Sequence, residues 1–184
     1  PVPSVPVFFM KPDTAILKNG EDFYLPEFSN EIHHELEIVL KISKAGKYIQ
    51  EEFAYNYFEE IGLGIAFTAR DLQQECKTKG LPWEIAKAFD HAAPLGKFFP
   101  KTKFENLNDF DFELRINDEI RQKGNTKEMI FDIDTIIAYV SQFVSLKIGD
   151  LIYTGTPAGV GPVSIGDKLI GFIGQEEMFN FEVK

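Results

Sequence analysis

Short apolar runs separated by glycine, proline, asparagine or aspartate fill much of this 184-residue chain. Runs of this length and composition predict β-strands, because branched and aromatic side chains pack well on a pleated sheet while the separating residues favour turns. The predicted strands are residues 5–10, 31–42, 62–67, 94–99, 112–116, 150–155, 168–174 and 179–183.

Helical periodicity is clear in only two places. In residues 132–144 apolar side chains recur three, four and seven positions apart, which predicts an amphipathic helix with acidic residues at its start. A second helix is predicted over 68–79, where Thr68 and Asp71 match a capping pattern and Gly80 follows the last turn. The fold class is therefore mainly β with a few helices (α+β), and we expect a single domain over residues 1–184.

Composition narrows the classes of function. The formal charge is −10, from 19 basic and 29 acidic residues, and no basic stripe runs along the chain. Nucleic-acid binding is therefore not expected, and a small-molecule partner is. The single cysteine, Cys76, excludes an intramolecular disulfide and a cysteine-rich zinc site, and we expect it to be a free thiol on a helix.

Hydropathy gives no sign of membrane insertion or secretion. No run reaches the roughly 18 to 20 apolar residues that a membrane span needs. The opening residues PVPSVPVFFM lack a basic segment followed by a long apolar run, so we do not expect them to be a signal peptide. We expect a soluble cytoplasmic protein, with residues missing before Pro1.

The stretch EIHHELEIVL holds the most suggestive polar residues. If residues 31–42 form a strand, His34 faces the core, whereas His33, Glu35 and Glu37 share the opposite face. Two carboxylates so placed can chelate a hard cation such as Mg²⁺ or Mn²⁺. The alternative is that the glutamates only solvate an outer strand face and that the histidines are packed and hydrogen-bonded.

Four motifs carry a family resemblance. They are FFMKP at 8–12, HHELE at 33–37, FTARDLQQECKTKGLPWEIAKAFD at 67–90 and IYTGTPAGVGP at 152–162. Together they resemble the fumarylacetoacetate hydrolase family, in particular its acylpyruvate hydrolase and oxaloacetate decarboxylase branch, over nearly the whole chain. The resemblance implies a mixed β-sandwich roll, a homodimer, and Mg²⁺ or Mn²⁺ bound through carboxylates.

Carried over by position, the resemblance makes Glu35 and Glu37 metal ligands. The family's third ligand is an aspartate two residues before the threonine of TARD, and here that position is Ala66. Two glutamates with water and substrate can still hold Mg²⁺, but we expect weaker binding, which Ala66→Asp would strengthen.

Four further residues are implied by the same motifs. Lys87 is expected near the metal and the substrate carboxylate as the catalytic candidate, and Arg70, Gln73 and Thr156 are expected to bind substrate. Each has a plainer alternative: the two cations could be surface charges, and the glycines of TGTPAGVGP serve turns whatever that loop binds.

The family's water-activating His and Glu lie in an N-terminal segment, expected to be a mobile lid, that these residues do not include. His33, His34 and His91 do not occupy the matching position, so none is predicted to be the general base.

The implied function is metal-dependent cleavage of a C–C bond beside a 2-oxo acid, through a pyruvate enolate. Acylpyruvate hydrolysis is the leading reaction, and oxaloacetate decarboxylation is a related one. A 2-oxo acid isomerase or tautomerase, and a metal-poor, catalytically impaired binding protein, remain alternatives.

Overall fold

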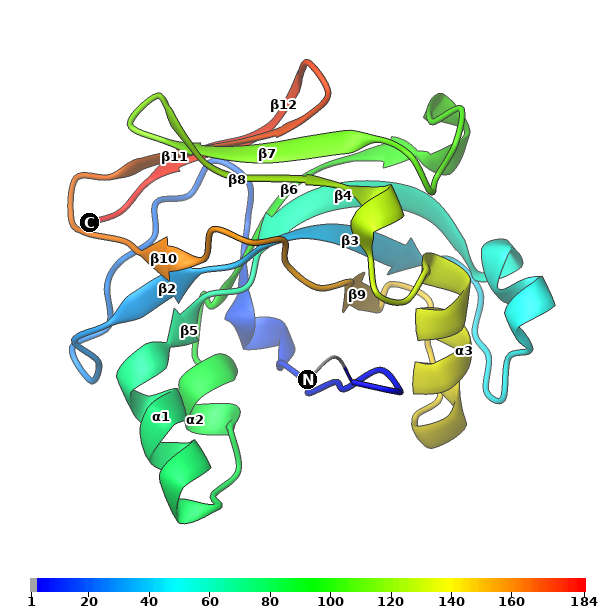
Figure 1. Ribbon diagram of the computed structural model, residues 1–184, viewed down its shortest axis with the longest axis horizontal. Helices are drawn as coiled ribbons and strands as arrows, with labels where there is room; N and C mark the ends of the chain where they lie inside the picture. Colours follow the sequence, from blue (N-terminus) through cyan, green and yellow to red (C-terminus); the bar gives the residue numbers. More distant parts are fainter. Residues whose placement is uncertain (1–2) are drawn as a thin grey trace.

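The computed structural model describes residues 3–184 as curled β-sheets with helices at their margins (Figure 1). The fold is mostly β, as the strand pattern predicted. The elements in chain order are η1 (Asp13–Ala15), β1 (Ile16–Leu17), β2 (Ile32–His34), β3 (Leu36–Ile42), η2 (Glu51–Tyr57), β4 (Phe58–Ile65), β5 (Thr68–Ala69), α1 (Arg70–Lys79), α2 (Glu84–Lys87), β6 (Ala93–Pro100), η3 (Lys101–Lys103), β7 (Asp111–Ile116), β8 (Glu119–Asn125), η4 (Thr126–Glu128), α3 (Ile133–Phe143), β9 (Leu151–Tyr153), β10 (Gly161–Pro162), β11 (Lys168–Ile173) and β12 (Glu176–Glu182).

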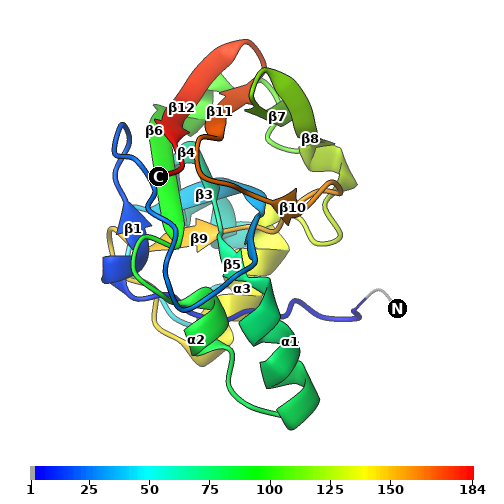
Figure 2. The same cartoon turned by 90° about the vertical axis from the view of Figure 1, so that its left-hand side faces the viewer.

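The strands form three sheets. A five-stranded sheet has the order β1-β6-β4-β3-β9, a four-stranded sheet has the order β12-β11-β7-β8, and a small one has the order β10-β2-β5. All neighbouring strands are antiparallel except β1 and β6. Figures 1 and 2 show the four-stranded sheet lying over the five-stranded one, while α1 and α2 lie near β5.

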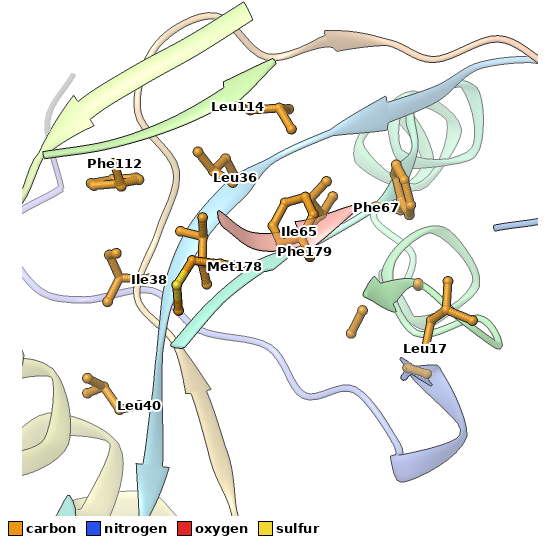
Figure 3. Close-up of a cluster of buried hydrophobic side chains, with 14 of the residues drawn as sticks. Leu17, Leu36, Ile38, Leu40, Ile65, Phe67, Phe112, Leu114, Met178 and Phe179 are labelled. Carbon is orange, nitrogen blue, oxygen red and sulfur yellow. The ribbon is translucent and has the colours of Figure 1, made fainter. Parts of the chain in front are cut away.

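Alternation along β3 decides which side chains enter the core. Leu36, Ile38 and Leu40 are buried and point into one hydrophobic cluster, together with Phe112 and Leu114 of β7 (Figure 3). The predicted core face of residues 31–42 is therefore confirmed. The intervening residues of β3 face the opposite side of the sheet, where residues 3–12 lie.

The two predicted helices differ in how well the sequence located their starts. α3 begins after Asp132, whose carboxylate accepts a hydrogen bond from Thr135 N at 2.8 Å, and it matches the prediction for 132–144. α1 ends at Lys79, and Gly80 follows it as predicted, with the left-handed φ of 66° that suits glycine.

The predicted start of α1 is wrong. Thr68 belongs to β5, and the residue before the helix is Ala69, which makes no capping hydrogen bond through its side chain. The Thr68 hydroxyl instead accepts a hydrogen bond from Lys87. Pairing of β5 with β2 holds Thr68 in an extended conformation, so tertiary structure overrides the local capping pattern.

The predicted strand at residues 5–10 is also absent. Pro6 has no N–H to donate to a ladder, and most of these side chains are exposed. Conversely, β8 and α2 were not predicted. β8 is a mostly polar strand with four exposed residues, held by pairing with β7, and α2 has only four residues.

Residues 3–12, called the N-terminal segment below, cross the face of the five-stranded sheet that is away from the four-stranded one (Figures 1 and 2). Phe8 packs against Tyr139 and Phe143 of α3, with ring centroids 6.5 and 5.9 Å apart. The segment thus joins α3 to the part of the sheet near α2. Within residues 3–184, no helix is both long and apolar enough to cross a bilayer.

Candidate metal and substrate site

Glu37 lies on β3, on the face opposite the hydrophobic cluster, and is only 6% exposed. Its partner across the ladder is Gly64 of β4. A Cβ at Gly64 would lie 2.8 Å from both the Tyr153 ring and the Pro94 carbonyl, so only glycine fits beside Glu37. The Glu37 carboxylate accepts a hydrogen bond from Gly155 N at 2.6 Å, which ties it to the TGTP loop.

The charge of Glu37 is not neutralised by any ion pair in the part of the chain that the structure describes. Burial raises the pKa of Glu37 to about 7 and the charge of Glu35 adds to this shift, whereas the Gly155 N–H and the charges of Lys87 and Lys11, which form no ion pair with Glu37, oppose it. A buried carboxylate is costly without a counter-charge, and a bound cation would supply one.

Glu35 lies in the short gap between β2 and β3 and meets two cations. Its Oε1 is 2.9 Å from an Arg70 nitrogen, and its Oε2 is 2.8 Å from Lys87 Nζ. Burial by itself would raise the pKa of Glu35, but the charges of Lys87 and Arg70 and their hydrogen bonds outweigh it and hold that pKa below its usual value. Glu35 therefore stays ionised at neutral pH.

Lys87 and Arg70 are themselves held in place. Lys87 ends α2 and is buried, and its Nζ donates to Thr68 Oγ1 at 2.6 Å and lies 5.0 Å from the centroid of the Phe9 ring. Arg70 donates to Oε1 of the buried Gln73 at 2.8 Å. Three of the residues singled out from sequence, Lys87, Arg70 and Gln73, are thus brought together around Glu35.

Ala66 stands on the same face of the sheet as the two glutamates. Its N–H donates to Glu35 O at 2.8 Å, one step beyond the pair Leu36 and Ile65, and opposite residues of an antiparallel ladder share a face. No group of three His, Cys, Asp or Glu side chains within residues 3–184 could hold a metal ion. Two carboxylates nevertheless fit Mg²⁺ or Mn²⁺, which commonly keep water and substrate as their other ligands.

Lys11 lies next to the candidate site, and the sequence pattern did not predict this position. Its Nζ donates to the backbone carbonyls of Phe67 at 3.3 Å, Ala92 at 3.2 Å and Lys87. Burial, aided by the nearby charge of Lys87, lowers the pKa of Lys11 to about 7. The one sequence feature that could have pointed to Lys11 is its place in the FFMKP motif. Through these three hydrogen bonds, Lys11 holds the N-terminal segment against the backbone near Lys87.

Thr156 lies on the TGTP loop, next to the residue that contacts Glu37. Its Oγ1 accepts a hydrogen bond from Gln122 Nε2 at 2.8 Å. Gln122, on β8, also contacts the buried His34.

Burial lowers the pKa of His34, which favours the neutral imidazole expected of a core histidine. The Nε2 atom of His33 lies 2.8 Å from Oε1 of Glu31.

Comparison with known proteins identifies a family and several relatives. The family described as Fumarylacetoacetate (FAA) hydrolase C-terminal matches residues 1–181. The mitochondrial oxaloacetate tautomerase FAHD1 of Mus musculus is 42% identical over 98% of this chain and 82% of its own length. The mitochondrial oxaloacetate decarboxylase of Dictyostelium discoideum is 39% identical over 99% of this chain and 84% of its own length.

A solved structure adds a ligand to the comparison. Fumarylpyruvate hydrolase from Pseudomonas aeruginosa, in complex with Mn²⁺ and pyruvate, is 34% identical with a TM-score of 0.90. The match covers 97% of this chain and 78% of that one. The fold expected from the resemblance is therefore confirmed.

The expectation of a cytoplasmic protein is wrong, because the relatives from Mus musculus, Homo sapiens and Arabidopsis thaliana are mitochondrial proteins. The prediction rested on the lack of a membrane-spanning run and of a signal-peptide pattern in the given residues. Neither observation determines the compartment, since organelles are reached through separate targeting segments.

Proposed function

Because the chain belongs to the fumarylacetoacetate hydrolase family, we propose that it is a metal-dependent enzyme that acts on 2-oxo acids through the enolate of a pyruvoyl group. The observation that carries the proposal is Glu37, a buried carboxylate without a cationic partner among residues 3–184, beside Glu35 and opposite Gly64. The activities of the relatives from Mus musculus and Dictyostelium discoideum support oxaloacetate as the first substrate to test.

Glu35 and Glu37 are the residues that would hold Mg²⁺ or Mn²⁺. When bound, the cation supplies positive charge that stabilises the negative oxygen of an enolate. The Gly155 N–H fixes one carboxylate oxygen of Glu37, and the ion pairs with Lys87 and Arg70 orient Glu35. The two acids are thus held in position before any ligand enters, which reduces the ordering cost of binding.

The chain's own cations and hydroxyls would hold the anionic substrate. Lys87 has a third N–H beyond those directed at Glu35 and Thr68, and that donor can meet a substrate carboxylate. The Phe9 ring covers the Lys87 ammonium, which limits the access of water to it. Thr156, which follows Gly155 on the loop that contacts Glu37, is the hydroxyl proposed for this role.

Three reactions share the enolate. Tautomerisation of oxaloacetate moves a proton between C3 and the 2-oxo oxygen and breaks no C–C bond. Decarboxylation breaks the bond from C3 to the terminal carboxylate, releases CO₂ and leaves pyruvate enolate, which takes up a proton. Acylpyruvate hydrolysis adds water to the 4-carbonyl and yields a carboxylic acid and pyruvate. The assays must therefore separate them by product.

A second candidate is a metal-poor, catalytically impaired protein that binds 2-oxo acids. Ala66 favours it, because one carboxylate fewer lowers the negative charge that attracts a divalent cation. The two candidates differ in turnover, and both predict metal-dependent binding of oxalate, a stable analogue of the pyruvate enolate.

The test joins binding and turnover. Thermal melts with Mn²⁺ and oxalate together should show a higher Tm than either alone, because a ligand that binds only the folded state stabilises it. Turnover is followed as loss of enol absorbance from oxaloacetate, as pyruvate from oxaloacetate, and as pyruvate from an acylpyruvate. Product from any one of these, dependent on Mn²⁺, supports the enzyme; an oxalate-dependent Tm shift without product supports the second candidate.

Glu37→Gln should abolish the Mn²⁺-dependent rise in Tm. Glu113→Gln is the matched control, because Glu113 is likewise a strand glutamate of low exposure but pairs with Arg115 on β7, in the four-stranded sheet. A Tm that does not respond to Mn²⁺ and oxalate in the unmodified protein would contradict both candidates.

A further inference from the structure

Gln122 joins three segments that are far apart in the chain. It lies on β8 with 1% of its surface exposed. Its Oε1 accepts from Leu36 N at 3.0 Å and lies 2.8 Å from His34 Nδ1. Its Nε2 donates to Thr156 Oγ1 at 2.8 Å and to the Pro157 carbonyl at 3.0 Å.

Two backbone groups fix which end of the Gln122 amide points where. The Leu36 N–H can only donate, so the atom that faces it must be the amide oxygen. The Pro157 carbonyl can only accept, so the atom that faces it must be the amide nitrogen. It follows that His34 donates to Oε1 from a protonated Nδ1.

The orientation of Gln122 decides the direction of the Thr156 hydroxyl. The two hydrogens of Nε2 are directed at Pro157 O and Thr156 Oγ1, so Oγ1 is an acceptor in that contact. The hydroxyl hydrogen of Thr156 must then point to a different acceptor. Within residues 3–184 no side chain or backbone oxygen accepts it, which leaves it available to a ligand.

We infer that Gln122 is a positioning residue for anion recognition: by donating to Thr156 Oγ1, it commits the Thr156 hydroxyl hydrogen to a carboxylate of the 2-oxo acid. The inference rests on the proposed function and deepens it. Thr156 follows Gly155, whose N–H donates to the Glu37 carboxylate at 2.6 Å, so one loop carries both the contact to a candidate metal ligand and the Thr156 hydroxyl.

A purely structural role for Gln122 would also explain its burial, because its four hydrogen bonds tie β8 to β2, β3 and the TGTP loop. The two roles differ in one respect. A positioning role acts through the Thr156 hydroxyl, whereas a structural role lowers stability whether or not that hydroxyl is present. A double-mutant cycle between the two positions separates them.

The experiment measures the Kd of oxalate by calorimetry in saturating Mn²⁺, and KM and kcat for oxaloacetate. Gln122→Met and Thr156→Val should each weaken oxalate binding by roughly 10- to 100-fold, the range for a lost hydrogen bond to a charged group. In the Thr156→Val background, Gln122→Met should add less than about twofold. Thr156→Ser, which keeps the hydroxyl, should retain the affinity, and KM should change more than kcat.

Gln122→Glu provides a variant of nearly the same shape. Its carboxylate can accept from Thr156, so the hydroxyl hydrogen turns toward position 122, and oxalate affinity should fall as in Gln122→Met. Ser141→Ala is the control for lost stability, because the Ser141 hydroxyl is buried, accepts from Ile49 N at 2.9 Å and lies on α3. It should lower Tm and leave the Kd of oxalate unchanged.

Two results would overturn the inference: a folded Gln122 variant with the unmodified Kd, or losses that add fully in the double variant. If Gln122→Met does not fold, the same two results are sought with Gln122→Glu in its place. Failure of the unmodified protein to bind oxalate with Mn²⁺ is a different result, because it defeats the proposed function and the inference together.

Discussion

At the scale of single residues, the site is a pair of carboxylates next to an alanine. Glu37 is buried without a counter-ion in the described chain, while Glu35 already has two. Ala66 is 1% exposed and faces the same side of the sheet. Position 66, opposite Glu35 at the end of the neighbouring strand, therefore carries no carboxylate.

Ala66→Asp should strengthen Mn²⁺ binding by roughly tenfold or more, since a third negative oxygen ligand attracts a divalent cation. The same change should lower Tm in a chelator, because it adds a buried carboxylate close to Glu35 and Glu37. Calorimetry with Mn²⁺, with and without oxalate, measures the first effect, and melts measure the second.

Ala66→Asn is the control for this substitution. Asparagine has nearly the same shape as aspartate and offers a neutral oxygen, so the Mn²⁺ affinity of this variant should lie between those of the unmodified protein and the Ala66→Asp variant. Equal Mn²⁺ affinity in all three proteins would mean that position 66 does not face the metal.

Sequence patterns located part of this site and missed part of it. Glu35 and Glu37 could be placed on one face because strand alternation is local, and family motifs pointed to Lys87. Gln122 and Lys11 could not be found in this way. Each reaches the site only through contacts between distant segments, and a polar residue on a polar strand such as β8 carries no periodic signal.

At the scale of elements, the start of α1 shows how tertiary contacts replace a local rule. Thr68 was expected to cap the helix, but it does not, and Asp71 in the first turn binds the loop before β2. Its carboxylate accepts from Ser29 Oγ at 2.6 Å, Asn30 N at 2.9 Å and Leu72 N at 2.8 Å. Pairing of β2 with β5 brings that loop to the helix, and local sequence does not set the register of that pairing.

Asp71→Asn should reduce the free energy of unfolding by about 1 kcal/mol at neutral pH, because it weakens these charge-assisted hydrogen bonds. Partial burial alone would raise the pKa of Asp71, but the hydrogen bonds from Ser29 and from backbone N–H groups lower it below 3.8. Its contribution is therefore complete above the unfolded pKa and is lost as pH falls through the folded pKa.

Urea unfolding as a function of pH tests this prediction. The gap between the two proteins should be largest at neutral pH and should narrow as pH falls below 3.8. Glu75→Gln is the control on the same helix, because Glu75 forms an exposed ion pair with Lys79 that contributes little. A gap that is constant with pH would show that the Asp71 charge is not the cause.

At the scale of the whole molecule, strand-rich patterning and the family motifs predicted the class of fold, but not how the sheets approach each other. The close spacing of the four-stranded and five-stranded sheets depends on Gly96 of β6. A Cβ there would lie 2.7 Å from Met178 O on β12 and 2.9 Å from Leu63 O on β4. Since a lone glycine within a strand has several explanations, its sequence neighbourhood does not reveal this one.

Gly96→Ala should lower the free energy of unfolding by about 1 to 3 kcal/mol, the usual cost of overpacking, with a lower Tm as the measured result. The two atoms that a methyl group would meet are backbone carbonyls in different sheets. Neither can rotate away as a flexible side chain would, so relief at Met178 O requires the two sheets to separate, and relief at Leu63 O requires the paired strands β4 and β6 to shift. Lys97→Ala, at the exposed neighbouring position, should change Tm little. Equal Tm values for the two variants would mean that the sheets can separate there at no cost, and the close approach at Gly96 would not be what fixes their spacing.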